Sequence, residues 1–330
     1  MQINCIYIWR SDRMKKFNIK SKANGLEKLL AIFTVIIFFS ISLTGCGGPS
    51  SAKSEKTIQA VGAENEYADV IKQIGGEYVS VTSIMNNLSA DPHSYESNTK
   101  DANAVSKAEL IVQNGIGYDD FMNKLESGSS NSKRTVIDVG KSLGYSKNTP
   151  NPHLWYDPKV MPKVAKLIAE NLEKQNPDQK KYFEDRLTKF NNSMKGYTDV
   201  LNEIKKNYSK AGVAVTEPVA DYMLNAAGVD TKTPWTFQTA VMNGTDPSPQ
   251  DVKMQQDLLK NKKVKVFLYN QQAVDDAAKN QLKIARANKV PVVGVYETMP
   301  PKHNYQTWME DEAKNLLKAL KNGVSTEKMS

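Results

Sequence analysis

Residues Asn176 to Lys210 read NPDQKKYFEDRLTKFNNSMKGYTDVLNEIKKNYSK, and this stretch decides how the rest of the chain is arranged. Its apolar residues recur at alternating intervals of four and three, and charged or amide residues fill most of the positions between them. The apolar residues are Phe183, Leu187, Phe190, Met194, Tyr197, Leu201, Ile204 and Tyr208. This spacing places them on one face of an α-helix, so we expect one long amphipathic helix.

Both ends of this helix carry the usual start and stop signals. Asn176 can act as the N-cap, Pro177 suits the first turn, and lysines gather toward Lys210 at the negative end of the helix dipole. A helix of this size is about 45 Å long, which exceeds the diameter of a domain made from either half of the remaining chain. We therefore expect it to contact both halves. The alternative is a coiled-coil strand or an ordinary helix within one domain.

Strand and helix signals alternate at short intervals on both sides of the long helix, which indicates largely parallel sheets. A chain of 330 residues can bury two cores of ordinary domain size. The predicted fold class is therefore α/β, with two lobes that each hold a largely parallel sheet flanked by helices. The predicted divisions are an N-terminal lobe at 57–175, a backbone linker helix at 176–210 and a C-terminal lobe at 211–330.

The N-terminal segment holds most of the positive charge. Residues 1–46 carry a net charge of +5, which leaves only +3 of the total +8 for the rest of the chain. A basic stretch ends at Lys28, an uncharged apolar run follows from Leu29 to Gly45, and Cys46 comes next. This order predicts a secretory signal peptide at 1–45. A transmembrane anchor is the alternative, but the run is short for a span of about 20 residues.

The segment at 46–56 is small and polar, as a flexible tether would be. The other cysteine, Cys5, lies in the predicted signal peptide, so we expect no disulfide in the mature chain. No stripe of Lys and Arg with interleaved aromatic residues follows, so we expect no nucleic acid as a partner. We expect a monomer.

Four polar residues occupy loops or strand ends where an α/β protein binds its ligand. His93 and His153 follow prolines in two loops of the first lobe, and Glu217 and Glu297 end two strands of the second lobe. Two imidazoles and two carboxylates form a nitrogen and oxygen set that suits Mn(II), Zn(II) or Fe(II), and the two negative charges balance the ion. The sequence therefore predicts a metal site formed by these four residues. The third histidine, His303, is expected at the surface.

Three other interpretations remain open at this point. Each of these four residues, taken singly, could be an ordinary turn or loop residue. A secreted metalloenzyme would need an open coordination position and a general base, and no further histidine or carboxylate motif supplies one. A receptor for an organic solute would not need the histidine pair. If a metal binds, its affinity should fall at acidic pH, because the imidazole must be neutral to coordinate.

Several motifs follow one another in a specific order, namely the LTGC segment ending at Cys46, DPHSYE, AELIVQNGIGYDDFM, NPHLWYDP, VTEPVADYML and VPVVGVYET. From about Thr57 onward the chain resembles the metal-binding solute-binding lipoproteins of bacterial ABC importers, the zinc and manganese uptake family (cluster A-I). This resemblance implies two lobes joined by one rigid helix, with the ion buried between them. It also implies a lipid on Cys46, a location at the outer face of the cell membrane (the periplasmic side where an outer membrane exists), and a membrane permease with its ATPase as partners.

The resemblance also implies a ligand set. The family's first two ligands match His93 and His153, and its third matches Glu217. The fourth is usually an aspartate after the last strand; here Glu297 is the nearest carboxylate, although an ungapped alignment places Met299 opposite that aspartate. The resemblance therefore implies a receptor for one Mn(II) or Zn(II) ion and no enzymatic activity. Glutamate at the third position resembles manganese-type members, but the general affinity order favours Zn(II), so the metal stays open.

Overall fold

The computed structural model describes residues 57–87 and 95–329. The predicted signal peptide at 1–45, the tether at 46–56 with Cys46, and His93 lie outside the described residues. Residues 57 onward belong to one compact unit. Within the described ranges, every helix is too short or too polar to cross a membrane.

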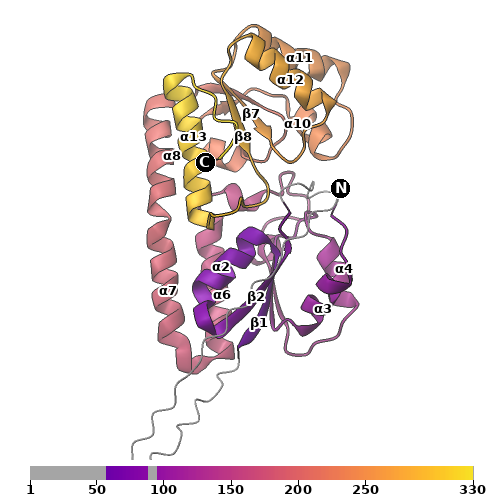
Figure 1. Cartoon of the computed structure of the whole chain (residues 1–330), viewed down its shortest axis with the longest axis vertical. Helices are drawn as coiled ribbons and strands as arrows, with labels where there is room; N and C mark the ends of the chain where they lie inside the picture. The colour runs from indigo at the N-terminus through magenta and orange to yellow at the C-terminus, as the bar shows by residue number, and fades with distance from the viewer. Residues whose placement is uncertain (1–56, 88–94, 330) are drawn as a thin grey trace, which may run out of the picture. The chain divides into compact units, whose positions relative to one another are not determined.

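Each half of the described chain builds a four-stranded sheet in which all neighbouring strands are parallel (Figure 1). The first sheet has the order β2-β1-β3-β4 and the second the equivalent order β6-β5-β7-β8. The strands are β1 (Ile58–Glu64), β2 (Val79–Met85), β3 (Leu110–Gln113), β4 (Thr135–Asp138), β5 (Gly212–Val215), β6 (Asp230–Thr231), β7 (Val266–Asn270) and β8 (Val292–Val295). The predicted α/β class is confirmed.

Helices follow most of these strands and cover both sheets. In the first half they are α2 (Asn65–Gly75), α3 (Thr99–Lys107), α4 (Phe121–Ser127), α5 (Val139–Ser142) and α6 (Val160–Gln175). In the second half they are α9 (Asp221–Ala226), α10 (Trp235–Met242), α11 (Pro249–Lys260), α12 (Asp276–Ala287) and α13 (Tyr305–Asn322). The sequence patterns do not indicate β6, α5 or α10, and a two-residue strand such as β6 is too short to show a period.

The long central segment is helical but not one uninterrupted helix. It consists of the 3-10 turn η4 (Pro177–Gln179), α7 (Lys180–Ser193) and α8 (Lys195–Tyr208), so the predicted single helix at 176–210 is wrong in this detail. The break falls at Met194, after two asparagines and Ser193, whose hydroxyl donates to the carbonyl of Phe190 at 2.7 Å. Such side chains compete for helix backbone groups. The side chain of Asn176 makes no capping hydrogen bond.

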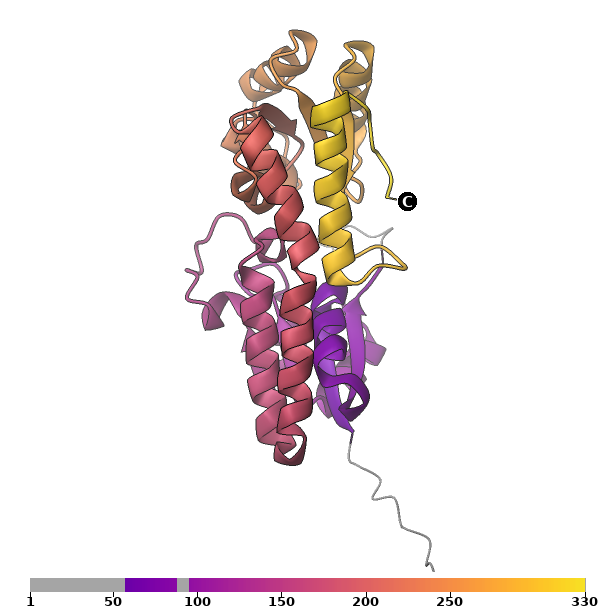
Figure 2. The same ribbon diagram turned by 90° about the vertical axis from the view of Figure 1, so that its left-hand side faces the viewer.

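The predicted apolar face of this segment is largely buried. Its buried members are Phe183, Phe190, Met194, Tyr197, Leu201 and Ile204. The helix α7 packs against α2 and α6 of the first half, and α8 packs against α13 of the second half (Figure 2). The segment therefore contacts elements from both halves of the chain, while the division into two lobes at the stated residues stays a prediction.

The contact between β1 and α2 generates a test of the packing. A Cβ added at Gly62 would lie 2.3 Å from the backbone nitrogen and 2.6 Å from the Cα of Ala68. Because helix backbone cannot swing aside, we expect Gly62→Ala to lower the free energy of unfolding by about 2–3 kcal/mol, measured by urea titration. Gly196→Ala is the matched control.

A Cβ at Gly196 would meet only the carboxylate end of Glu310, which can rotate away. We expect that control to change the free energy of unfolding by no more than about 1 kcal/mol, since alanine also favours the helix. Equal effects of the two substitutions would contradict the close packing of β1 on α2.

Candidate metal centre

His153 lies in the loop that leads from the first sheet into α6, directly before the 3-10 turn η3 (Leu154–Tyr156). Its side chain is completely buried. The ring nitrogen Nδ1 lies 2.7 Å from the side-chain oxygen Oδ1 of Asn151, and the backbone N–H of His153 donates to the same oxygen at 3.0 Å. Two hydrogen bonds within the Asn-Pro-His loop therefore fix the orientation of the imidazole.

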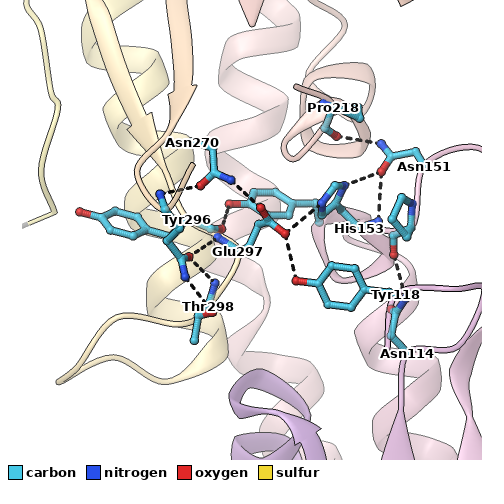
Figure 3. Close-up of polar contacts among 12 residues, drawn as sticks. Asn114, Tyr118, Asn151, His153, Pro218, Asn270, Tyr296, Glu297 and Thr298 are labelled. Carbon is cyan, nitrogen blue, oxygen red and sulfur yellow. Dashed lines mark hydrogen bonds and ion pairs between the residues drawn. The ribbon is translucent and has the colours of Figure 1, made fainter. Parts of the chain in front are cut away.

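Asn151 also decides which ring nitrogen carries the proton (Figure 3). Its amide nitrogen Nδ2 donates to the carbonyl of Pro218 at 2.8 Å, so its amide oxygen must be the atom that faces His153. Because an amide oxygen only accepts, Nδ1 of His153 carries a proton. A neutral imidazole then keeps its lone pair on Nε2, which is the form that binds a metal ion.

Glu297 follows β8 and is 1% exposed. Its carboxylate oxygen Oε2 lies 3.3 Å from Nε2 of His153 and accepts a hydrogen bond from the hydroxyl of Tyr118 at 3.0 Å. The other oxygen, Oε1, accepts from the amide of Asn270 at the end of β7. Both halves of the chain thus hold this carboxylate in place, as Figure 3 shows.

The backbone around Glu297 is held as firmly as its side chain. The N–H groups of Glu297 and Thr298 both donate to the side-chain oxygen of Gln272 at 2.8 Å. The side-chain amide of Asn65, at the start of α2, bonds both the N–H and the carbonyl of Met299 at 2.8 Å. The side chain of Met299 is partly buried and packs against the main hydrophobic core.

The contact between His153 and Glu297 has a chemical consequence. With the proton on Nδ1, a neutral His153 presents a lone pair at Nε2 to a carboxylate oxygen, and two such acceptors repel unless a proton or a cation lies between them. An imidazole nitrogen and a carboxylate oxygen are both ligands for divalent transition metals. The buried pair can therefore hold a positive charge.

The described residues bring together two of the four predicted ligands. Glu217 follows β5 and is 4% exposed; its neighbour Pro218 is bonded to Asn151, two residues before His153. His93 lies outside the described residues. Among residues 57–87 and 95–329, no three histidine, cysteine or acidic side chains are grouped closely enough to hold a metal ion.

His303 lies in a separate loop and does not belong to this group. Its Nε2 is 3.4 Å from Asp311, and its imidazole side chain is only 9% exposed. His303 as a whole is partly exposed, while its ring is largely covered where it pairs with Asp311 of α13.

Several buried carboxyl groups lie close to the candidate centre. Burial raises the pKa of Glu66 well above its ordinary value, and the charges of Glu297 and Asp119 raise it further. Burial likewise raises the pKa of Asp119 to about 7 and that of the Tyr118 hydroxyl well above 10, so Tyr118 stays a hydrogen-bond donor. A cation at the centre would stabilise the ionised forms of these carboxyl groups, so the environment favours the binding of a cation over that of an anion.

Several residues that shape the centre are not indicated by the sequence patterns. These are Asn65, Asn114, Tyr118, Asn151, Asn270 and Gln272. Asn114, directly after β3, donates to the carbonyl of Pro152 at 2.9 Å and accepts from the hydroxyl of Tyr67 at 2.7 Å. The signal that could have found Asn114 and Asn270 is their position at strand ends, which also identified the glutamates.

A surface pocket of about 630 Å³ lies elsewhere in the first half, and its lining includes Gln113, Asp138, Lys141 and Tyr145. Of the predicted ligands in the described part of the chain, namely His153, Glu217 and Glu297, none lines it. The pocket is therefore separate from the candidate metal centre.

Comparisons with known proteins agree with the motifs. The model of the ZnuA family, described as the periplasmic zinc-uptake complex component A, matches residues 61–319. The manganese ABC transporter substrate-binding lipoprotein PsaA of Streptococcus mitis is 24% identical over 272 residues, which cover 76% of this chain and 84% of the relative.

Solved structures share the fold. The Mn-bound periplasmic metal-binding protein of Candidatus Liberibacter asiaticus superposes with a TM-score of 0.66 at 18% identity, covering 80% of this chain and all of that one. A crystal structure of ZnuA gives a TM-score of 0.62 at 20% identity, covering 79% of this chain and 98% of that one. The family comprises substrate-binding receptors for metal transport and not enzymes. Because the family model spans most of its length, the chain belongs to the ZnuA family of periplasmic zinc-uptake components.

Proposed function

We propose that this protein binds one divalent transition metal ion, Mn(II) or Zn(II), and delivers it to an ABC permease and its ATPase for import. The observation that carries the proposal is the buried contact between Nε2 of His153 and Oε2 of Glu297, two acceptors 3.3 Å apart that need a positive charge between them. One comes from each half of the chain, as expected if the ion sits between the two sheets. Fe(II) also suits this set of donors.

The proposed ligands are His93, His153, Glu217 and Glu297. Two carboxylates neutralise a divalent ion, which lowers the cost of burying it. Asn151 supports this set because it orients His153 and at the same time bonds Pro218, the residue after Glu217. Glu297 takes the place of the family's aspartate, and the packing of the Met299 side chain against the core favours this assignment.

The receptor is proposed to be a monomer that is held at the outer face of the membrane by a lipid on Cys46. The support is the LTGC segment after an apolar run, together with the relatives that are named lipoproteins. A tethered receptor meets its permease by two-dimensional diffusion, so the polar segment at 46–56 would give it reach.

Metal binding is tested by elemental analysis of the chain from Gly47 onward, followed by thermal melting of the stripped protein with Mn(II) and with Zn(II). We expect one equivalent of metal, and a gain of about 2.7 kcal/mol in unfolding free energy at a free metal concentration 100 times the dissociation constant. His153→Ala should abolish the shift and His303→Ala should keep it. No bound metal and no shift with either ion would overturn the proposal and favour an organic solute.

The fourth ligand is tested by two neighbouring substitutions. Glu297→Gln keeps the shape of the side chain but removes its charge, so we expect metal affinity to fall by at least about 100-fold, more than the loss of a supporting residue. Met299→Leu conserves apolar volume and should leave affinity within about threefold. Isothermal titration with both metals measures each change. The reverse ranking would assign the position to Met299.

The role of Asn151 is tested by Asn151→Ala. The substitution frees the imidazole of His153 to rotate and to change tautomer, so we expect metal affinity to fall by about 10–100-fold. Asn148→Ala, at an exposed position in the same loop, is the control and should bind metal as the unsubstituted protein does. Equal affinities for the two variants, measured by competition with a chelator, would show that Asn151 does not orient the ligand.

A further inference from the structure

Glu312 lies on α13 and is completely buried. Its oxygen Oε1 accepts hydrogen bonds from the indole N–H of Trp308 at 2.7 Å and from the backbone N–H of Tyr296 at 3.1 Å. Its oxygen Oε2 lies 2.7 Å from the hydroxyl oxygen of Tyr156. No described lysine or arginine forms an ion pair with this carboxyl, so nothing positive offsets its charge if it is ionised.

The hydroxyl of Tyr156 has one proton but two close oxygen neighbours. Besides Oε2 of Glu312, the carbonyl oxygen of Tyr296 lies 2.6 Å from it. If Glu312 were ionised, both neighbours would only accept, and one of these two short contacts would lack a proton. If Glu312 is protonated on Oε2, it donates to Tyr156 and Tyr156 donates to the Tyr296 carbonyl. Only the protonated form satisfies both contacts.

This network joins the segments that carry two proposed metal ligands. Tyr156 ends the turn η3, three residues after His153, and Tyr296 directly precedes Glu297. The hydroxyl of Tyr197 on α8 donates to the backbone carbonyl of Tyr156 at 3.0 Å, which fixes the turn from a third side. The carboxyl of Glu312 therefore sits where the relative position of the two ligand segments is set.

The groups that face Glu312 are neutral at ordinary pH. They are Tyr156 on η3, Tyr197 on α8 and Tyr296 after β8, together with Trp308 on its own helix. Burial raises the pKa of Glu312 from its ordinary value of 4.5 to about 8, against the smaller opposing effect of its three hydrogen-bond partners. The raised pKa agrees with the conclusion, drawn from the two close contacts of the Tyr156 hydroxyl, that Glu312 is protonated.

We propose that Glu312 is a positioning residue whose carboxyl is protonated at neutral pH and, in that form, ties Tyr156 to Tyr296 so that His153 and Glu297 keep the spacing that a metal ion requires. The role toward the ligands rests on the proposed function, whereas the protonation of Glu312 does not. Ionisation at alkaline pH places two acceptors against one hydroxyl proton, which loosens the link between the ligand segments.

The first test measures the stability of the metal-free protein by urea unfolding between pH 5 and pH 9. A carboxyl whose folded-state pKa is raised contributes stability that is full below pH 4.5 and is lost as the pH rises through about 8. In that window, the folded-to-unfolded ratio of the unsubstituted protein should fall relative to that of Glu312→Gln by about tenfold per pH unit. Glu310→Gln, a partly exposed carboxyl on the same helix, should follow the unsubstituted protein.

The second test uses infrared difference spectra at pH 7 between the unsubstituted protein and Glu312→Gln. We expect a carbonyl band of a protonated carboxylic acid that is lost in the variant. A carboxylate band in its place, or a pH profile of Glu312→Gln identical to that of the unsubstituted protein, would overturn the protonation.

The third test measures Mn(II) and Zn(II) affinity at pH 7 and at pH 9. Glu312→Ala should weaken binding by about tenfold or more, and Glu312→Gln, whose amide can donate to Tyr156, should restore most of the loss. Raising the pH should weaken binding to the unsubstituted protein relative to Glu312→Gln. Equal affinities for the alanine variant and the unsubstituted protein would overturn the positioning role. Failure of the unsubstituted protein to bind either metal would instead overturn the proposed function, while the first two tests still decide the protonation.

Discussion

The contact between the imidazole of His153 and the carboxylate of Glu297 is the interaction on which the architecture of the centre depends. Each of these buried groups is costly to remove from water, so each needs partners with defined geometry. Asn151 supplies them for the imidazole, and Tyr118 and Asn270 supply them for the carboxylate. The contact between a ring nitrogen and a carboxylate oxygen suits a small cation better than a neutral solute.

The two parallel sheets explain why these side chains meet. Parallel strands direct all their carboxyl ends to one edge, and the segments that follow β3, β4, β5, β7 and β8 supply the residues of the centre. The near-continuous helical segment of α7 and α8 contacts elements of both halves and holds Tyr197 against the turn that follows His153. Regular structure therefore brings His153 and Glu297 together.

A feature of the fold or of the candidate centre could be predicted from the sequence when its physical cause lies in residues close together in the chain. The apolar face of the long helix follows from a regular spacing of nearby residues, and its burial is confirmed. The break at Met194 arises because Ser193 and its neighbours compete for helix backbone groups, and the regular spacing of apolar residues gives no sign of it. The placement of Glu297 at a strand end is also local. In contrast, the hydrogen bonds of Asn65 to Met299 join residues 234 positions apart, and no sequence pattern predicts them.

The environments of Glu312 and His303 could not be predicted from the sequence. Glu312 belongs to the acidic run MEDEAK, where nothing in the sequence distinguishes it from the partly exposed Glu310, and only the packing of α13 shows that it is buried. His303 follows a proline-rich turn that is typical of a surface loop, and its ring pairs with Asp311 of α13. The buried environment of Glu312 depends on Tyr156, which lies 156 positions away in the sequence.

The two hydrogen bonds between the side chain of Asn65 and the backbone of Met299 connect the start of α2 to the segment that follows Glu297. A side-chain amide that bonds both the N–H and the carbonyl of one residue holds that residue at two points. Met299 lies two residues beyond Glu297, so a displacement of the start of α2 would be transmitted through the backbone to this proposed ligand. A force applied to α2 would thus reach the candidate centre without a competing ligand entering it.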